Sequence, residues 1–162
     1  MSIPQNSAQT HNPQRPPAGV WLAAASLVFA ALVVAGLASP LSSSLDGLTR
    51  YGSEPPGITN YIPALWYGSA GLHLLSALLV VLRPARTQVL VAVLSIPGIL
   101  CSGYSVATGF KHSSLIGFPA PTFIYLGFFG VLFVVLAGIN LGKSNVRAWL
   151  APGSGGESES GT

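Results

Sequence analysis

A single histidine, His73, lies within a long uncharged stretch, WYGSAGLHLLSALLVVL at residues 66–82. Ionisable side chains are costly inside a membrane and commonly mark function, so three chemistries arise: a haem or metal ligand, a proton relay, or a contact with a quinone or lipid. A bis-histidine haem needs a second histidine at the same depth, but His11 lies in the polar N-terminal segment and His112 follows the third apolar segment. A relay needs further titratable groups at that depth, which the segments lack. We therefore predict a structural role for His73, and neither a cofactor nor a metal site.

Depth along the helices predicts which groups face His73. The histidine lies about 14 Å from the basic end of its own helix, close to the midplane of a bilayer. The same depth along the other segments reaches Ser26, Ser95, Gly130 and the backbone carbonyl of Val93. Pro97 releases that carbonyl from its usual helical hydrogen bond. We predict that His73 hydrogen-bonds to such groups and acts as a polar clamp between the second and third helices.

Motifs for other chemistry are not found in the sequence. It contains no P-loop, no HExxH and no GxSxG. Its one cysteine, Cys101, excludes an intrachain disulfide, a CxxC pair and a four-cysteine metal site. The spacing of four between Asp46, Arg50 and Glu54 predicts a surface ion-pair ladder on one helical turn. Because the four apolar segments contain no Asp, Glu, Lys or Arg, we predict neither an ion-coupled transporter nor an enzyme.

The composition indicates which elements position these residues. Hydrophobic residues make up 50% and charged residues 7% of the 162-residue chain, and the mean hydropathy is +0.60, whereas about a quarter of an ordinary soluble domain is charged. Four runs reach the ~20 apolar residues that a spanning helix needs, and the first exceeds the ~7–15 residues of a signal-peptide core. They lie near residues 19–38, 61–82, 87–108 and 119–141. The predicted fold is all-α, an integral membrane four-helix bundle that occupies residues 18–147.

The basic residues predict the orientation of this bundle. Those on one side are Arg15, Arg83, Arg86, Lys143 and Arg147, whereas only Arg50 and Lys111 fall in the other two loops. Lys and Arg concentrate on the cytoplasmic side of membrane proteins. We predict a multi-pass protein of the cell inner membrane with both termini in the cytoplasm. The pI near 9.4 reflects this topology and not a nucleic-acid partner. Residues 1–17 and 148–162 are too polar to bury a core and are predicted to be disordered tails.

Small residues on each span predict how the helices associate. In lipid, close helix contact relies on small side chains that let two backbones approach. The second helix offers Gly68 and Gly71, and the fourth offers Gly127 and Gly130. We predict packing within the bundle through these residues, with a homo-oligomer through one such face as the alternative.

Aromatic residues gather toward the predicted outer side. The candidates for a binding groove on that side are Trp66, Tyr67, Tyr104 and Tyr125. Aromatic belts at membrane interfaces account for most aromatic residues of this kind. The excess on one side also predicts an outer groove for a lipid or a partner helix.

The order of these features resembles a known family. A polar low-complexity N-terminus, four spans, an outer loop with an Asp-Gly step, the turn RPAR, and the segment ATGFKHSS before an aromatic fourth span follow one another over residues 19–147. In this plan the chain is similar to the actinobacterial thirty-four-kilodalton antigen-like membrane proteins. The resemblance implies an inner-membrane envelope protein associated with cell-wall growth or division machinery, without catalytic residues.

Two functions are compatible with these observations. The first is a non-catalytic scaffold or accessory subunit of a bacterial cell-envelope complex, in contact with the lipid bilayer and with membrane protein partners. The second is a small transporter or channel component, or a lipid-binding protein, for an uncharged or lipidic ligand. The absence of charge from the spans favours the first over coupled transport but says little against lipid binding.

Overall fold

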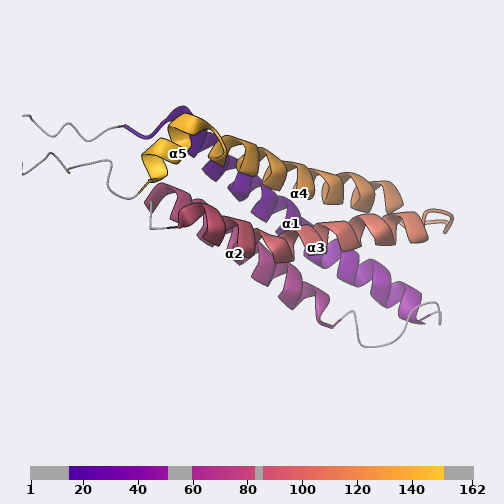
Figure 1. The fold of residues 1–162 in the computed structure, drawn as a ribbon. Helices are drawn as coiled ribbons and strands as arrows, with labels where there is room; N and C mark the ends of the chain where they lie inside the picture. The colour runs from indigo at the N-terminus through magenta and orange to yellow at the C-terminus, as the bar shows by residue number, and fades with distance from the viewer. Residues whose placement is uncertain (1–14, 51–59, 83–85, 152–162) are drawn as a thin grey trace, which may run out of the picture.

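The computed structural model describes residues 15–50, 60–82 and 86–151. These residues form five helices and no strand: α1 (Ala18–Arg50), α2 (Ile62–Leu82), α3 (Thr87–Lys111), α4 (Ala120–Leu141) and α5 (Ser144–Leu150). The four long helices run up and down in a bundle, in which α1 and α3 each pack against both α2 and α4 (Figure 1). The prediction of an all-α fold with four long apolar helices is confirmed.

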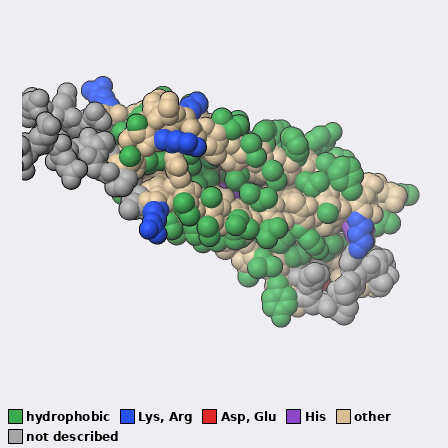
Figure 2. Space-filling model, viewed as in Figure 1, with side chains coloured by type: hydrophobic (Ala, Val, Ile, Leu, Met, Phe, Trp, Pro, Cys, Tyr) green, Lys and Arg blue, Asp and Glu red, His purple; other side chains and the backbone are tan. Residues whose placement is uncertain are grey.

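Each long helix is long and apolar enough to cross a membrane. Their outward faces carry large apolar side chains, which cover much of the visible surface (Figure 2). Exposed examples from each helix are Leu32, Leu74, Leu100 and Ile139. A helix that is apolar on all sides is typical of a membrane span or of a buried core.

Helix α1 is longer than the sequence pattern predicts. The outer loop was expected from residue 39, but the helix continues through Pro40 to Arg50. Leu41 and Leu45, four residues apart, are fully buried in a cluster with Ile62 and Phe118, and this burial stabilises helix in a serine-rich stretch. At 1.5 Å per residue, 33 residues measure about 50 Å, more than the ~30 Å of a hydrocarbon core.

Helix α5 lies across the start of the predicted C-terminal tail. The tail was expected from residue 148, yet α5 continues to Leu150, and both Leu150 and Val146 are buried. Val146 packs on Gly19 of α1, where an added Cβ would lie only 2.7 Å from Val146 Cγ2. The tail prediction is therefore wrong for residues 148–150, because buried contacts hold them in a helix. Of the remaining tail residues, 15–17 and 151 are described and lie outside the helices, and residues 1–14 and 152–162 lie outside the described ranges.

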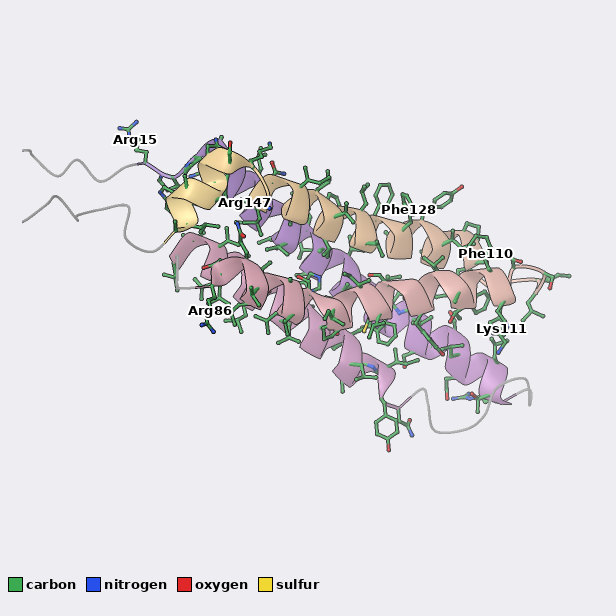
Figure 3. All side chains as sticks on the ribbon, viewed as in Figure 1. Arg15, Arg86, Phe110, Lys111, Phe128 and Arg147 are labelled. Atoms are coloured by element: carbon green, nitrogen blue, oxygen red, sulfur yellow. The ribbon has the colours of Figure 1, made fainter. Side chains whose placement is uncertain are left out.

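The two ends of the bundle differ in charge. Arg15, Arg86 and Arg147 lie at the end where the described chain begins and finishes, and Lys111 lies at the opposite end (Figure 3). We call these the basic end and the far end. Asp46, the one acidic residue within the described ranges, belongs to the far part of α1.

Candidate functional site

His73 is fully buried at the contact between α2 and α3. Its Nδ1 donates a hydrogen bond of 2.9 Å to the carbonyl oxygen of Ser69, one turn earlier in the same helix. Its Nε2 has no hydrogen-bond partner in the described chain. The ring lies directly on Gly98 of α3, where a Cβ would be 2.7 Å from Nε2 and 2.8 Å from Nδ1. His73 thus joins the two helices by packing.

The hydrogen bonds predicted for this clamp are not made. The Ser95 hydroxyl donates to the carbonyl of Val91 at 2.8 Å, and the Ser26 hydroxyl donates to the carbonyl of Leu22, also at 2.8 Å. A carbonyl four residues earlier is always within reach of a helical serine, whereas a partner on another helix must match in both depth and direction. The predicted clamp is therefore wrong in its hydrogen bonds, although the contact between α2 and α3 at His73 is present.

The other polar groups between α2 and α3 are also bonded locally. Ser76 and Ser105 donate to the carbonyls of Leu72 and Cys101, at 2.8 and 3.0 Å. Two contacts cross between the helices, both at the Cys101 thiol: one with the Ser69 hydroxyl at 3.3 Å and one with the carbonyl of Leu65 at 3.9 Å. Hydroxyls that donate to their own helix do not form a continuous proton path. Within the described ranges, no group of three or more His, Cys, Asp and Glu residues is placed to hold a metal ion.

The predicted ion-pair ladder is present in part. The Arg50 guanidinium lies 3.0 Å from the Asp46 carboxylate, one turn apart on α1, and both side chains are exposed. Glu54 lies outside the described residues. An exposed pair of this kind contributes little to stability, so we assign it no functional role.

A groove of about 370 Å³ opens between α2 and α3 in the half of the bundle nearer the far end. The rings of Trp66 and Tyr104 meet edge to face in it, with centroids 5.7 Å apart. Its lining is almost entirely apolar and consists of Ile62, Leu65, Trp66, Ser69, Pro97, Leu100, Cys101 and Tyr104. We call it the aromatic groove. Its shape and chemistry suit an apolar chain or ring and offer little for a polar substrate.

Only two of the four aromatic residues predicted for an outer groove line this one. Tyr67 and Tyr125 are 54% and 65% exposed and point elsewhere. Successive helical residues differ by about 100° in direction, so Tyr67 cannot share a groove with its neighbour Trp66. The sequence prediction also missed Ser69, Cys101 and Leu100. Their spacing of three and four from Trp66, Pro97 and Tyr104 was the available signal.

The four predicted packing glycines divide into two pairs. Gly127 and Gly130 lie against α3: a Cβ on Gly127 would be 2.6 Å from the Ser102 carbonyl oxygen, and one on Gly130 would overlap the Ser102 hydroxyl. Gly68 and Gly71 instead point outward, with nothing within 4 Å of an added Cβ. Packing within the bundle is therefore correct for the α4 pair and wrong for the α2 pair. We call Ala64, Gly68 and Gly71, all exposed on α2, the α2 glycine face.

Comparison with known proteins finds no relative: no family model matches the chain, and no curated protein or solved structure is significantly similar to it. The resemblance to the actinobacterial thirty-four-kilodalton antigen-like proteins therefore stays a prediction. The fold and the sites define the class: an all-α bundle of four helices long and apolar enough to cross a membrane, with an apolar groove and an exposed glycine face.

Proposed function

We propose that the chain is a non-catalytic, multi-pass integral membrane protein that acts as a scaffold or accessory subunit in a bacterial cell-envelope complex. The observation that carries this proposal is the α2 glycine face. Elsewhere in the bundle, buried glycines such as Gly98, Gly127 and Gly130 let a neighbouring helix approach closely. Gly68 and Gly71 present the same kind of surface without a neighbouring helix among the described residues.

Insertion in a membrane is supported by the surface of the bundle. Four helices have the length and hydropathy of spans, and their outward sides expose aliphatic and aromatic residues. Water would make this surface costly, at about 25 cal/mol per Å² of apolar area, whereas lipid tails match it. The buried serines Ser76, Ser95 and Ser105 donate to carbonyls of their own helices, which satisfies these hydroxyls without water.

The charges support the proposed orientation. The basic end carries Arg15, Arg86, Lys143 and Arg147. The positive-inside rule then assigns the basic end to the cytoplasm and the α3–α4 loop to the outside of the inner membrane.

A partner helix is the natural occupant of the α2 glycine face. Association of helices in lipid depends on small residues that permit close contact. In the first turns of α2, Ala64, Gly68 and Gly71 recur at intervals of four and three, which aligns them along one side of the helix. A helix of another membrane protein, or α2 of a second copy, packs there at short distance.

Site-specific photo-crosslinking in cells tests this proposal. A photoreactive residue at position 75, one turn after Gly71, is compared with one at position 128 on the outward side of α4 (Figure 3). We expect one discrete protein adduct from position 75 and lipid adducts from position 128. Mass spectrometry of the adduct separates a second copy from another protein. Gly68→Leu together with Gly71→Leu is expected to reduce the adduct about five-fold or more.

Gly36→Leu is the matched control, because Gly36 of α1 also faces open space. It is expected to leave the adduct unchanged. Lipid adducts alone from position 75, or an equal loss of adduct in the Gly36 variant, would contradict the scaffold proposal.

A second candidate function is favoured by the aromatic groove. We propose that, in this case, the chain binds an uncharged lipidic ligand between α2 and α3, against Trp66 and Tyr104. Leu100→Trp fills the groove from an exposed position on its rim. Native mass spectrometry of the purified protein is expected to show a bound apolar molecule that this variant loses. Leu90→Trp, exposed on α3 outside the groove, is the control.

A further inference from the structure

A second groove of about 370 Å³ runs between α3 and α4 toward the basic end. On α3 it is lined by Gln88, Val91, Ala92, Ser95 and Ile99, and on α4 by Val134, Ala137, Gly138, Leu141 and Gly142, with Leu27 of α1 and Arg147 of α5. The residues of each wall recur at intervals of three and four, so the groove follows the helices lengthwise. We call it the α3–α4 groove.

The length of this groove matches one leaflet of a bilayer. From Gln88 to Ile99 the α3 wall extends about 16 Å at 1.5 Å per residue, and half of a ~30 Å hydrocarbon core is ~15 Å. Gly138 adds depth, because nothing lies within 4 Å of the position its Cβ would occupy. An acyl chain that enters from the basic end therefore fits along the whole groove.

A cation, Arg147, lies at the end of the α3–α4 groove nearer the basic end, which we call the mouth of the groove; its apolar length is the shaft. Arg147 is exposed, and its guanidinium makes no ion pair or hydrogen bond with residues of the described ranges. Its position is set by α5, since the preceding residue, Val146, is fully buried against Gly19. Gln88 of α3 joins the two walls of the groove, because its side-chain amide donates a hydrogen bond of 3.1 Å to the carbonyl of Leu141 in α4. The mouth thus offers an exposed guanidinium, unpaired with any of the described residues, above an apolar shaft.

We propose that the α3–α4 groove binds one anionic phospholipid from the leaflet at the basic end. An acyl chain lies against Val91, Ala92 and Val134, and Arg147 donates two parallel hydrogen bonds to the phosphate, an arrangement for which the planar guanidinium is suited. The combination of an apolar shaft with Arg147, the one cation among its described lining residues, matches a phospholipid and not a free anion, which has no use for the shaft. The proposal rests on insertion of the bundle in a membrane and is independent of the scaffold role.

Native mass spectrometry of the full chain tests it directly. The protein is released from detergent in the presence of equal amounts of phosphatidylglycerol and phosphatidylcholine with identical acyl chains. We expect the singly bound species to favour phosphatidylglycerol by about five-fold. Arg147→Gln is expected to abolish this preference while binding of phosphatidylcholine persists. Gly138→Leu, which fills the shaft without a clash, is expected to reduce binding of both lipids.

Two control variants separate a site from a diffuse effect. Arg86→Asn removes a charge from the same end at a residue with φ 64°, a conformation that Asn tolerates, and Gly103→Leu adds an exposed side chain outside the groove. Both are expected to retain the wild-type preference. Equal binding of the two lipids by the wild-type protein, or a loss in Arg86→Asn as large as in Arg147→Gln, would overturn the proposal. Displacement of the lipid by excess glycerol 3-phosphate would likewise assign the site to a free anion.

Discussion

His73 is a packing residue, and its position depends on the glycine opposite it on α3, Gly98. The imidazole satisfies Nδ1 within α2 and leaves Nε2 without a partner among the described residues. Only a residue without a side chain leaves room for the ring on α3, and Gly98 provides that room. The pair therefore fixes the point along their lengths at which α2 and α3 pack together, a role that neither residue would have alone.

Gly98→Ala is expected to destabilise the bundle by about 1–3 kcal/mol, because the new Cβ overlaps the His73 ring. Unfolding with increasing SDS in mixed micelles, followed by circular dichroism, measures the change. Gly103→Ala is the control, since that position is open and alanine favours helix. Combination with His73→Ala is expected to recover part of the loss. Equal stability of the two glycine variants would contradict the packing role of His73.

Gly127 and Gly130 permit a second test, because they face different parts of Ser102. Gly130→Ala is expected to overlap the Ser102 hydroxyl, whereas Gly127→Ala meets the Ser102 backbone carbonyl at 2.6 Å. Both variants should lose about 1–3 kcal/mol of stability. Ser102→Ala is expected to rescue Gly130→Ala and not Gly127→Ala, since only the hydroxyl is removed. A double-mutant cycle on unfolding free energies measures this difference, and rescue of both variants would contradict the geometry.

The helices themselves show how tertiary contacts extend local structure. The last third of α1 contains Pro40 and a run of three serines, which are poor helix residues. Leu41 and Leu45 nevertheless bury completely against the start of α2 and the segment before α4. The extension of α1 thus joins the start of α2 to the segment before α4, and it follows from long-range packing more than from propensity.

Leu45→Ala is expected to cost about 2–5 kcal/mol, the usual range for a buried leucine. The same unfolding experiment measures it, and faster proteolysis after Arg50 in the native protein would report local fraying of α1. Leu32→Ala, an exposed position on the same helix, is expected to have a much smaller effect. Similar losses in both variants would show that the far part of α1 does not pack as described.

The molecule as a whole is an up-and-down bundle of four long helices, so α1 begins and α4 ends at the same end (Figure 1). The long helices expose large apolar side chains (Figure 2), whereas several described cations lie at that end. The grooves lie at different heights: the aromatic groove toward the far end and the α3–α4 groove toward the basic end. With the proposed insertion of the bundle in a membrane, each groove would face a different leaflet.

Cysteine labelling tests this arrangement. In a Cys101→Ser background, a cysteine at position 113 in the α3–α4 loop is expected to react with a membrane-impermeant maleimide in intact cells. A cysteine at position 144, at the start of α5, is expected to react only after permeabilisation. Labelling of position 144 in intact cells would reverse the proposed orientation, and labelling of both would contradict an even number of spans.

The sequence alone was sufficient for the class of fold. Length and hydropathy are local properties, so four runs of about 20 apolar residues predict four spanning helices without any knowledge of their neighbours. The spacing of four between Asp46 and Arg50 predicted the surface ion pair for the same reason. Both predictions depend only on residues close together in the chain.

Contacts between distant segments decided the rest. Glycine permits close approach but does not specify it, so the sequence did not distinguish Gly68 and Gly71, which face outward, from Gly127 and Gly130, which lie against α3. Arg147 lies at the mouth of the α3–α4 groove because the preceding residue, Val146, packs on Gly19, which is far away in the chain. The direction in which a helical side chain points is fixed by how four helices pack together, and that is a property of the assembled bundle.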